Sequence, residues 1–198
     1  DALFEVLQEK GVPRLPWSEE ALRTRKRLNF LHTLAPDTWP DATDAALQES
    51  MEVWLRPHLS GLRSMEQVTR IDFNELLLAE LSWEQRQEMD HMAPTHLQVP
   101  SGSRIAIDYT DPTAPVLAVR LQEVFGMLET PRIGGGKVPV LMHLLSPASR
   151  PVQVTRDLRS FWNTGYFDVR KDLRGRYPKH HWPDNPLEAQ ATRGTKKR

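Results

Sequence analysis

Apolar residues recur with a helical period through the first half of the chain. Four of them form one stripe at positions i, i+4, i+7 and i+8: Leu47, Met51, Trp54 and Leu55. This spacing predicts a single helix over residues 42–56, with Pro57 as its stop. Ser18 before two acids, and Ser82 three residues before Gln85, are typical of helix N-termini.

Residues 15–92 are therefore predicted to form a helical subdomain. Asp72, with Glu75 three residues later, marks a further helix start within it. Residues 1–14 have the pattern of the end of an upstream helical domain, because a short apolar helix is stopped there at Gly11.

The apolar period changes from 3.6 to 2 near Pro94. Alternating or continuous apolar runs predict five strands, at residues 96–99, 104–109, 116–119, 138–145 and 151–155. The turn at residues 100–103 predicts a hairpin between the first two, and residues 121–125 fit either a strand or a short helix. Residues 94–155 are thus expected to form a small β-barrel-like subdomain or a curled antiparallel sheet.

The helical period returns after residue 155. One stripe of this segment is predicted to be core: Trp162, Tyr166, Val169 and Leu173. A break is possible at residues 163–165, and Gly175 is a natural stop. We expect residues 156–186 to be a basic C-terminal helical segment and 187–198 a disordered tail. The predicted fold class is α+β.

Composition excludes several classes of protein. The 198 residues include no cysteine, so neither a disulfide framework nor a thiolate metal site can form. No apolar run is long enough to predict a membrane span. These features favour a cytoplasmic protein without a membrane partner.

The net charge of zero hides an asymmetry. Residues 1–99 hold 10 basic and 17 acidic residues, whereas residues 100–198 hold 16 and 9. Residues 150–179 alone hold eight basic and three acidic residues. A basic segment in a neutral chain indicates contact with a polyanion, although the two halves could instead attract each other.

Aromatic residues are interleaved with the basic residues of this segment, a composition suited to phosphate contact and base stacking. The candidate phosphate contacts are Arg150, Arg156, Arg170, Lys171, Arg174, Arg176 and Lys179. Tyr177 and Trp182 are the candidate stacking residues. The alternative is a solvated helix face whose charges pair with Asp168 and Asp172.

No other candidate motif in the sequence has the residues that its chemistry needs. Gly134–Lys137 is not a phosphate-binding loop, because Val138 replaces the Ser/Thr magnesium ligand and Pro131 the first glycine. It is interpreted as a hairpin loop. The histidine pairs lack a carboxylate at ligand spacing, and no nucleophile with a base can be proposed. We therefore predict no catalytic residues, metal site or ATP hydrolysis in this chain.

Several segments resemble the carboxyl-terminal region of the bacterial ATP-dependent helicase HrpB family. They are PVLAVRLQEVFG (115–126), LSP (145–147), RPVQVT (150–155), DL (157–158), VRKDLRGRYPKH (169–180), WP (182–183), SGSRI (101–105) and IDY (107–109). The resemblance covers about residues 15–186. His181 departs from it, since proline is expected there.

The resemblance implies a DEAH/DExH-like helicase of superfamily 2. Such a protein has two RecA-like motor domains, a winged helix and a helical bundle upstream, and ATP and Mg²⁺ bind in the motor. Their motifs are absent here, so no cofactor-binding residue is carried over, and we expect this chain to be one region of a longer protein. By analogy with related helicases, residues 94–155 would lie over the nucleic-acid channel.

We therefore expect an accessory module of an ATP-dependent helicase, inactive as an NTPase by itself. Its partners would be single-stranded or structured nucleic acid, with RNA favoured, and the motor domains of the same protein. The alternative is a scaffold module that braces those domains. Binding predicts a continuous basic face, whereas a scaffold predicts that salt bridges bury Arg170 and Arg174.

Overall fold

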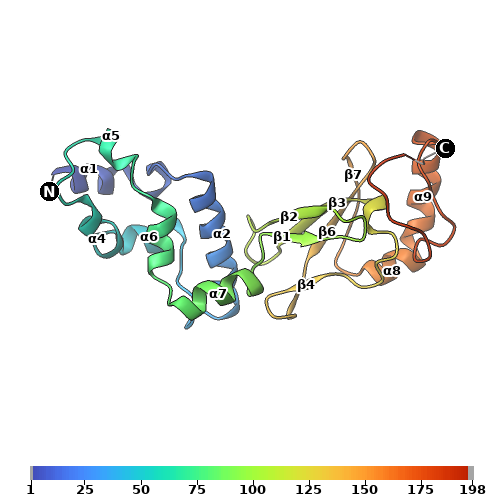
Figure 1. The fold of residues 1–198 in the computed structure, drawn as a ribbon, viewed down its shortest axis with the longest axis horizontal. Coiled ribbons are helices and arrows are strands. Elements are labelled where there is room, and N and C mark those ends of the chain that lie inside the picture. Colours follow the sequence, from blue (N-terminus) through green and yellow to red (C-terminus); the bar gives the residue numbers. More distant parts are fainter. Residues whose placement is uncertain (1, 196–198) are drawn as a thin grey trace. The chain divides into compact units, whose positions relative to one another are not determined.

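Helices form the first unit of the computed structural model, which describes residues 2–195 (Figure 1). This unit takes in the residues up to 93 and residues 109–113. Its elements are α1 (Ala2–Lys10), η1 (Val12–Arg14), α2 (Glu19–Leu34), α3 (Asp44–Glu49), α4 (Met51–Trp54), η2 (Arg56–Leu59), α5 (Met65–Val68), α6 (Phe73–Ala79) and α7 (Trp83–Met92). The helical prediction for this part of the sequence is confirmed.

The predicted helix starts are also confirmed. Ser18 caps α2 and Asp72 caps α6, each by accepting backbone N–H groups, and Ser82 forms a full capping box with Gln85. The single helix predicted over residues 42–56 was wrong, because α3 and α4 separate at Ser50 (φ −93°, ψ 7°). The Ser50 hydroxyl donates to the carbonyl oxygen four residues earlier, a bond that competes with regular helix geometry.

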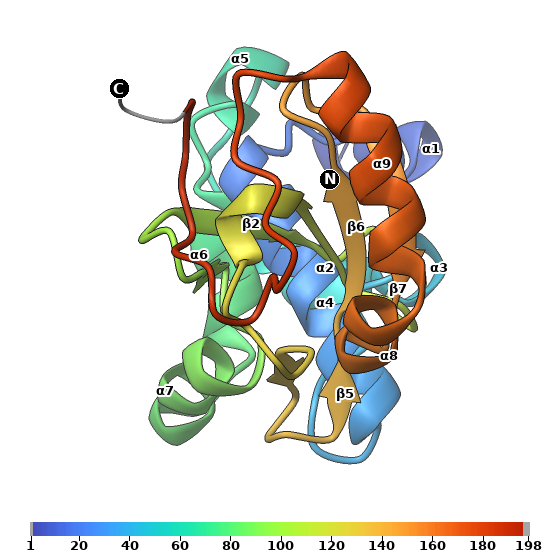
Figure 2. The ribbon, with the colours of Figure 1, turned by 90° about the vertical axis from the view of Figure 1, so that its right-hand side faces the viewer.

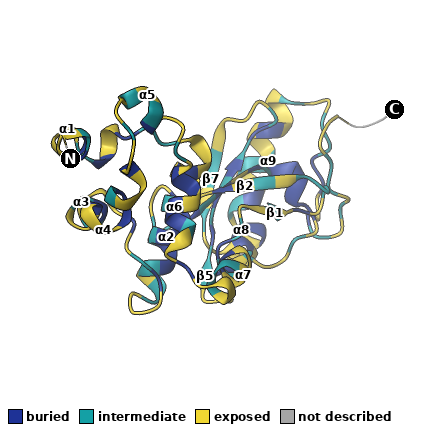
Figure 3. Ribbon diagram, turned by 60° about the vertical axis from the view of Figure 1, so that its left-hand side comes forward, coloured by how far each residue is buried: buried dark blue, intermediate teal, exposed yellow. Residues whose placement is uncertain are grey.

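Aromatic rings fill the core of the first unit. Trp17 stacks on Trp54 with 6.0 Å between ring centroids, and Phe73 meets Trp17 edge-on at 5.2 Å. The returning segment 109–113 adds Tyr109, whose ring lies 5.2 Å from that of Phe30. Each helix has a buried and an exposed side (Figure 3). Burial of this kind contributes about 2 kcal/mol or more per large side chain.

The second unit holds residues 94–108 and the chain from 114 onward. Its main sheet has the order β1-β2-β3-β6-β7, and β4 and β5 form a separate hairpin. The strands are β1 (His96–Gln98), β2 (Arg104–Asp108), β3 (Val116–Arg120), β4 (Arg132–Ile133), β5 (Val138–Pro139), β6 (Leu141–Leu145) and β7 (Pro151–Thr155). The hairpin between β1 and β2 is confirmed, with Leu97 opposite Ile105.

The sheet does not close into a barrel, and it is not wholly antiparallel. Its edge strands β1 and β7 are not paired with each other, and β3 runs parallel to β6, with Val116 opposite Leu141. A parallel pair needs a long crossover, which residues 121–140 supply. This crossover contains the 3₁₀ helix η3 (Leu121–Val124). Of the strand and the short helix that the sequence allowed for residues 121–125, the structure therefore has the short helix. The strand predicted over 138–145 is split, because β5 pairs with β4 and β6 with the main sheet.

Two helices follow the sheet, α8 (Leu158–Asn163) and α9 (Gly165–Arg176). Trp162, Tyr166 and Leu173 are buried, which confirms most of the predicted stripe. Gly175 does not end α9, because the helix continues for one more residue. Asp157 caps α8 by accepting the backbone N–H of Ser160, and this bond lowers the pKa of its carboxyl group.

The chain after α9 turns back along the second unit, as the red segment of Figure 2 shows. The amide of Gly126 donates to the carbonyl of Pro186 at 2.9 Å, and that of Thr192 to the carbonyl of Gln122 at 3.0 Å. Residues 196–198 of the predicted disordered tail lie outside the described residues. The subdomain boundaries expected from the sequence stay predictions.

Candidate nucleic-acid interface

The exposed surface of α9 separates charges of opposite sign. Successive helix residues are about 100° apart, so Lys171 and Arg174 share one side and Asp172 and Arg176 lie on the other, while Asp168 lies between them, about 60° from Lys171. Asp172 pairs with Arg176 at 3.4 Å. Neither Lys171 nor Arg174 has a side-chain hydrogen bond or ion pair within residues 2–195, and both are exposed. The basic side of α9 is therefore available to an anion.

Arg170 is committed to the fold. Its Nε donates to the carbonyl oxygen of Trp182 at 3.0 Å, and its Nη2 donates to Asp184 at 2.6 Å. Only 19% of the side chain is exposed, whereas that of Asp184 is 96% exposed. Arg170 therefore fastens the chain after α9 to that helix. Its charge is largely balanced within the molecule by Asp184.

The end of α9 lies beside the turn between β6 and β7. The Tyr177 hydroxyl is 3.5 Å from the hydroxyl of Ser146, whose backbone N–H and side chain also bond to Arg150. Ser149 in this turn has a φ of 60°, a left-handed conformation that tightens the turn. These contacts bring the turn that holds the exposed Arg150 next to the end of α9, and the exposed Lys179 follows Tyr177 by two residues.

Arg156 lies apart from this group. It follows β7, whereas Arg150 precedes the strand, and six residues of extended chain span about 20 Å. The Arg156 side chain is exposed, and its carbonyl oxygen accepts the Thr130 hydroxyl. Nearby, Arg159 pairs with Glu129. The structure therefore does not gather all the predicted phosphate contacts into one cluster.

The two predicted stacking residues differ in how far their rings are exposed to a ligand. Trp182 is 6% exposed, and its indole N–H donates to the carbonyl of Tyr177 at 2.9 Å. Stacking of a base on Trp182 would require the returning chain to open. Tyr177 is half-buried between the end of α9 and Ser146.

The glycine-rich loop connects β4 to β5, which confirms its interpretation as a hairpin loop. Three successive glycines, Gly134–Gly136, have φ values of 64°, 68° and 82°. Arg132 closes the loop by donating to the carbonyl of Gly136 at 2.7 Å. A strand follows the loop, so there is no helix N-terminus here to hold a phosphate, and these residues do not fit ATP.

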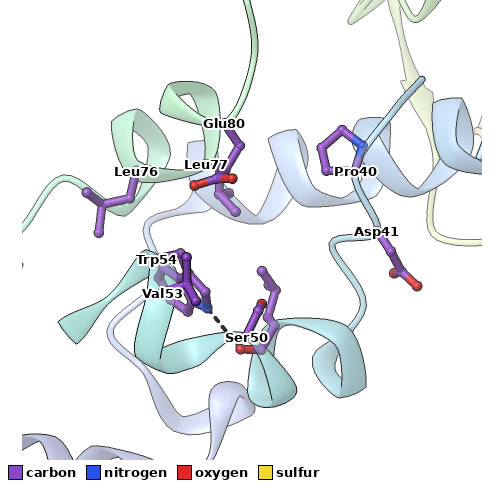
Figure 4. A pocket seen from close by; sticks show the side chains of 9 residues that line it. Pro40, Asp41, Ser50, Val53, Trp54, Leu76, Leu77 and Glu80 are labelled. Carbon is purple, nitrogen blue, oxygen red and sulfur yellow. Dashed lines mark hydrogen bonds between the residues drawn. The ribbon is translucent and has the colours of Figure 1, made fainter. Parts of the chain in front are cut away.

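A hollow in the first unit has a volume of about 90 Å³ (Figure 4). Small-molecule sites usually need several hundred Å³. Glu80 and Ser50 border the hollow, while the Asp41 carboxylate points away from it. The polar groups do not converge, so the hollow has no arrangement suited to acid–base catalysis.

Two further findings concern the chain as described. Within residues 2–195, none of the helices combines the length and apolar character needed to cross a bilayer. No group of three or more histidine or carboxylate side chains in the same range is placed to hold a metal ion.

Comparison with known proteins gives a consistent match. The family model described as "ATP-dependent helicase C-terminal" (HrpB_C) matches residues 54–186. The chain is 43% identical over 197 residues to the "ATP-dependent RNA helicase HrpB" of Escherichia coli (strain K12). The aligned region covers 99% of this chain and 24% of that protein. The chain thus spans about a quarter of the length of this relative.

Two solved structures are also similar. The crystal structure of the E. coli DExH-box NTPase HrpB matches with a TM-score of 0.87 and 42% identity, over 97% of this chain and 24% of that chain. The crystal structure of the E. coli DEAH/RHA helicase HrpB matches with a TM-score of 0.69 and 40% identity, over 90% and 23%.

Proposed function

The chain belongs to the ATP-dependent helicase C-terminal family, and on this basis we propose that it is the nucleic-acid-gripping module of a helicase. The resemblance in the sequence motifs is confirmed by these matches. In the proposal, the module contacts single-stranded or structured nucleic acid beside the motor domains of the same protein. ATP and Mg²⁺ would act in those motor domains, and this chain would contribute no cofactor-binding residue.

One observation carries the proposal: among the exposed cations of the second unit without a side-chain partner in residues 2–195, four lie on α9 or close to its C-terminal end. They are Arg150, Lys171, Arg174 and Lys179. An exposed cation without an internal carboxylate keeps its full charge for a phosphate. Release of condensed counterions then supplies most of the binding free energy.

The arrangement of the acids also supports the proposal. Asp172 lies on the opposite side of α9 from Arg174 and pairs with Arg176, and Asp168, three residues before Lys171, forms no ion pair with it within residues 2–195. If this side of α9 only had to stay solvated, pairs of opposite charge four residues apart would stabilise the helix more than unpaired cations do. Asp172 and Arg176 form such a pair elsewhere on α9.

RNA is the favoured ligand. The relative from E. coli carries the name of an RNA helicase, and the contacts proposed here are to phosphates, which both nucleic acids have. Phosphate contacts fix position without reading sequence, so little sequence preference is expected from this module.

The scaffold function remains the second candidate, and Arg170 is the observation that favours it. Its bonds to Trp182 and Asp184 hold the returning chain on α9. A module whose basic residues all served in this way would brace neighbouring domains instead of binding RNA. Lys171 and Arg174 do not fit that pattern.

The proposal is tested with the 198-residue chain and a labelled single-stranded RNA. The variant Lys171→Gln/Arg174→Gln is compared with Lys26→Gln/Arg63→Gln, which removes two exposed charges from the first unit. The first variant is expected to bind more than tenfold more weakly at about 0.15 M salt, since two phosphate contacts are lost. Equal affinity of the two variants would favour the scaffold function.

A further inference from the structure

We propose that Phe167 is the base-stacking residue of this interface, and that the basic side of α9 therefore takes single-stranded nucleic acid in preference to duplex. This inference rests on the proposed function. Phe167 is 51% exposed and lies in the first turn of α9. A single exposed apolar residue is ordinary by itself, and what distinguishes Phe167 is the pair of cations beside it.

Phe167 shares its side of α9 with the two free cations. Lys171 follows it by four residues and Arg174 by seven, and the three side chains project within about 60° of one another around the helix axis. Together they cover about 10 Å of the axis, so one short stretch of strand can contact all three. An aromatic ring flanked by two unpaired cations is the combination with which proteins hold a single strand.

The ring is also braced against movement. It meets the ring of Tyr166 edge-on, at 5.7 Å between centroids and an interplanar angle of 65°. Tyr166 is fully buried, and its hydroxyl donates to the carbonyl of Pro183 at 2.7 Å. Because this neighbour is fixed, the Phe167 ring loses less conformational freedom when a base stacks on its exposed face.

The acids of α9 do not interfere with this stripe. Asp172 pairs with Arg176 away from the stripe, Asp184 is engaged by Arg170, and Asp168, although only three residues before Lys171, forms no ion pair with it within residues 2–195. The stripe formed by Phe167, Lys171 and Arg174 thus combines a ring face with positive charge. Duplex nucleic acid stacks its bases on one another, so only a strand with free bases can use the ring.

The first unit supplies a matched control. Trp83 is 72% exposed at the start of α7, but the residues four and seven positions later are Gln87 and Asp90. Trp83 is thus an exposed ring on a helix without a basic stripe. Removing it changes the exposed aromatic surface without touching the proposed interface.

The experiment compares two labelled ligands of about 12 nucleotides, a single-stranded oligomer and the same sugar–phosphate chain without bases. We expect the 198-residue chain to bind the oligomer with bases roughly tenfold more tightly. Phe167→Ala should abolish that ratio while leaving the salt dependence and the affinity for the abasic chain unchanged. Phe167→Trp should restore the ratio, and Trp83→Ala should leave it unaltered.

The outcomes separate the two proposals. If the unmodified chain binds neither ligand, the proposed function fails and the role of Phe167 fails with it. If the chain binds but Phe167→Ala keeps the full ratio between the ligands, only the role of Phe167 is overturned. Phe167→Leu keeps an apolar side chain and removes the ring, so it decides the matter should the alanine variant unfold.

Discussion

The Nε of Arg170 donates to the carbonyl oxygen of Trp182 at 3.0 Å and so ties the last helix to the chain that follows it. The two residues are twelve positions apart, and both belong to the most basic and aromatic part of the sequence. One basic residue and one aromatic residue of this segment therefore stabilise the fold, while their neighbours Lys171 and Arg174 remain exposed.

Loss of the Arg170 side chain is expected to loosen the returning chain. Arg170→Gln removes a charged donor from the Trp182 carbonyl, and the free energy of unfolding should fall by about 1–2 kcal/mol. The pair with the exposed Asp184 adds little to this value. Urea unfolding measures the loss, and limited proteolysis should show faster cleavage after residue 177. Unchanged stability and cleavage would contradict the role given to Arg170.

Arg174 and Arg176 should differ as RNA contacts although they are two residues apart. Arg174→Gln removes one phosphate contact, so affinity should fall about fourfold at 0.15 M salt, with the slope of log affinity against log salt flatter by about 0.7. Arg176→Gln should have a smaller effect, because Asp172 at 3.4 Å already balances that charge. Fluorescence anisotropy at several salt concentrations measures both quantities. A larger effect of Arg176→Gln would contradict the separation of charges on α9.

Tyr166 should make the second unit sensitive to alkali. Burial raises the pKa of its phenol, and the fold therefore favours the neutral form. This contribution to stability is fully present below the ordinary value of about 10 and is lost as the pH rises beyond it. Tyr166→Phe should lower stability by about 1 kcal/mol at pH 7, since the Pro183 carbonyl loses its donor, and should lose less stability between pH 7 and 11. Thermal melting over this pH range tests both expectations.

Glu123 should be important for stability although it is not a site residue. Its side chain is 3% exposed, accepts the hydroxyls of Ser101 and Ser103 at 3.0 and 2.5 Å, and pairs with Arg120 at 3.2 Å. Glu123→Ala leaves these donors without an acceptor, so the expected loss is about 2–4 kcal/mol.

Glu129→Ala is the matched control for this prediction. Glu129 pairs with Arg159 at an exposed position, where a salt bridge is worth about 0–1 kcal/mol. Chemical unfolding of the two variants side by side gives the comparison. Equal stability of the two variants would show that the bonds of Glu123 contribute little.

Local signals in the sequence predicted most of the secondary structure. Ser18, Asp72 and Ser82 mark helix starts because a capping bond joins residues only two or three positions apart. The hairpin of β1 and β2 was equally visible, since a short turn joins two alternating runs. The separation of α3 from α4 was not visible, because the bond from Ser50 to the preceding turn competes with a regular apolar stripe.

Long-range pairing limited what could be predicted. The parallel alignment of β3 with β6 depends on a crossover of about 20 residues, and no local pattern in the sequence distinguishes it from an antiparallel neighbour. The burial of Trp182 likewise results from the turning back of the chain onto α9. These contacts decide which basic and aromatic residues are accessible.

The candidate site was predictable as a segment but not residue by residue. The excess of basic residues pointed to α9 and its flanks as the candidate segment, while the internal bonds of Arg170 could not be seen in the sequence. The apolar period did not identify Phe167, because this residue lies off the buried stripe of Trp162 and Tyr166. Its spacing of four and seven residues from Lys171 and Arg174 was a signal that could have revealed it.

The central claim is that this chain grips single-stranded RNA through exposed cations of its second unit. A titration of the 198-residue chain with a single-stranded RNA, at salt concentrations from 50 to 300 mM, tests it most directly. Four phosphate contacts, by Arg150, Lys171, Arg174 and Lys179, predict that log affinity falls with log salt at a slope of about −3. No measurable binding at 50 mM salt, or binding that does not change with salt, would contradict the claim.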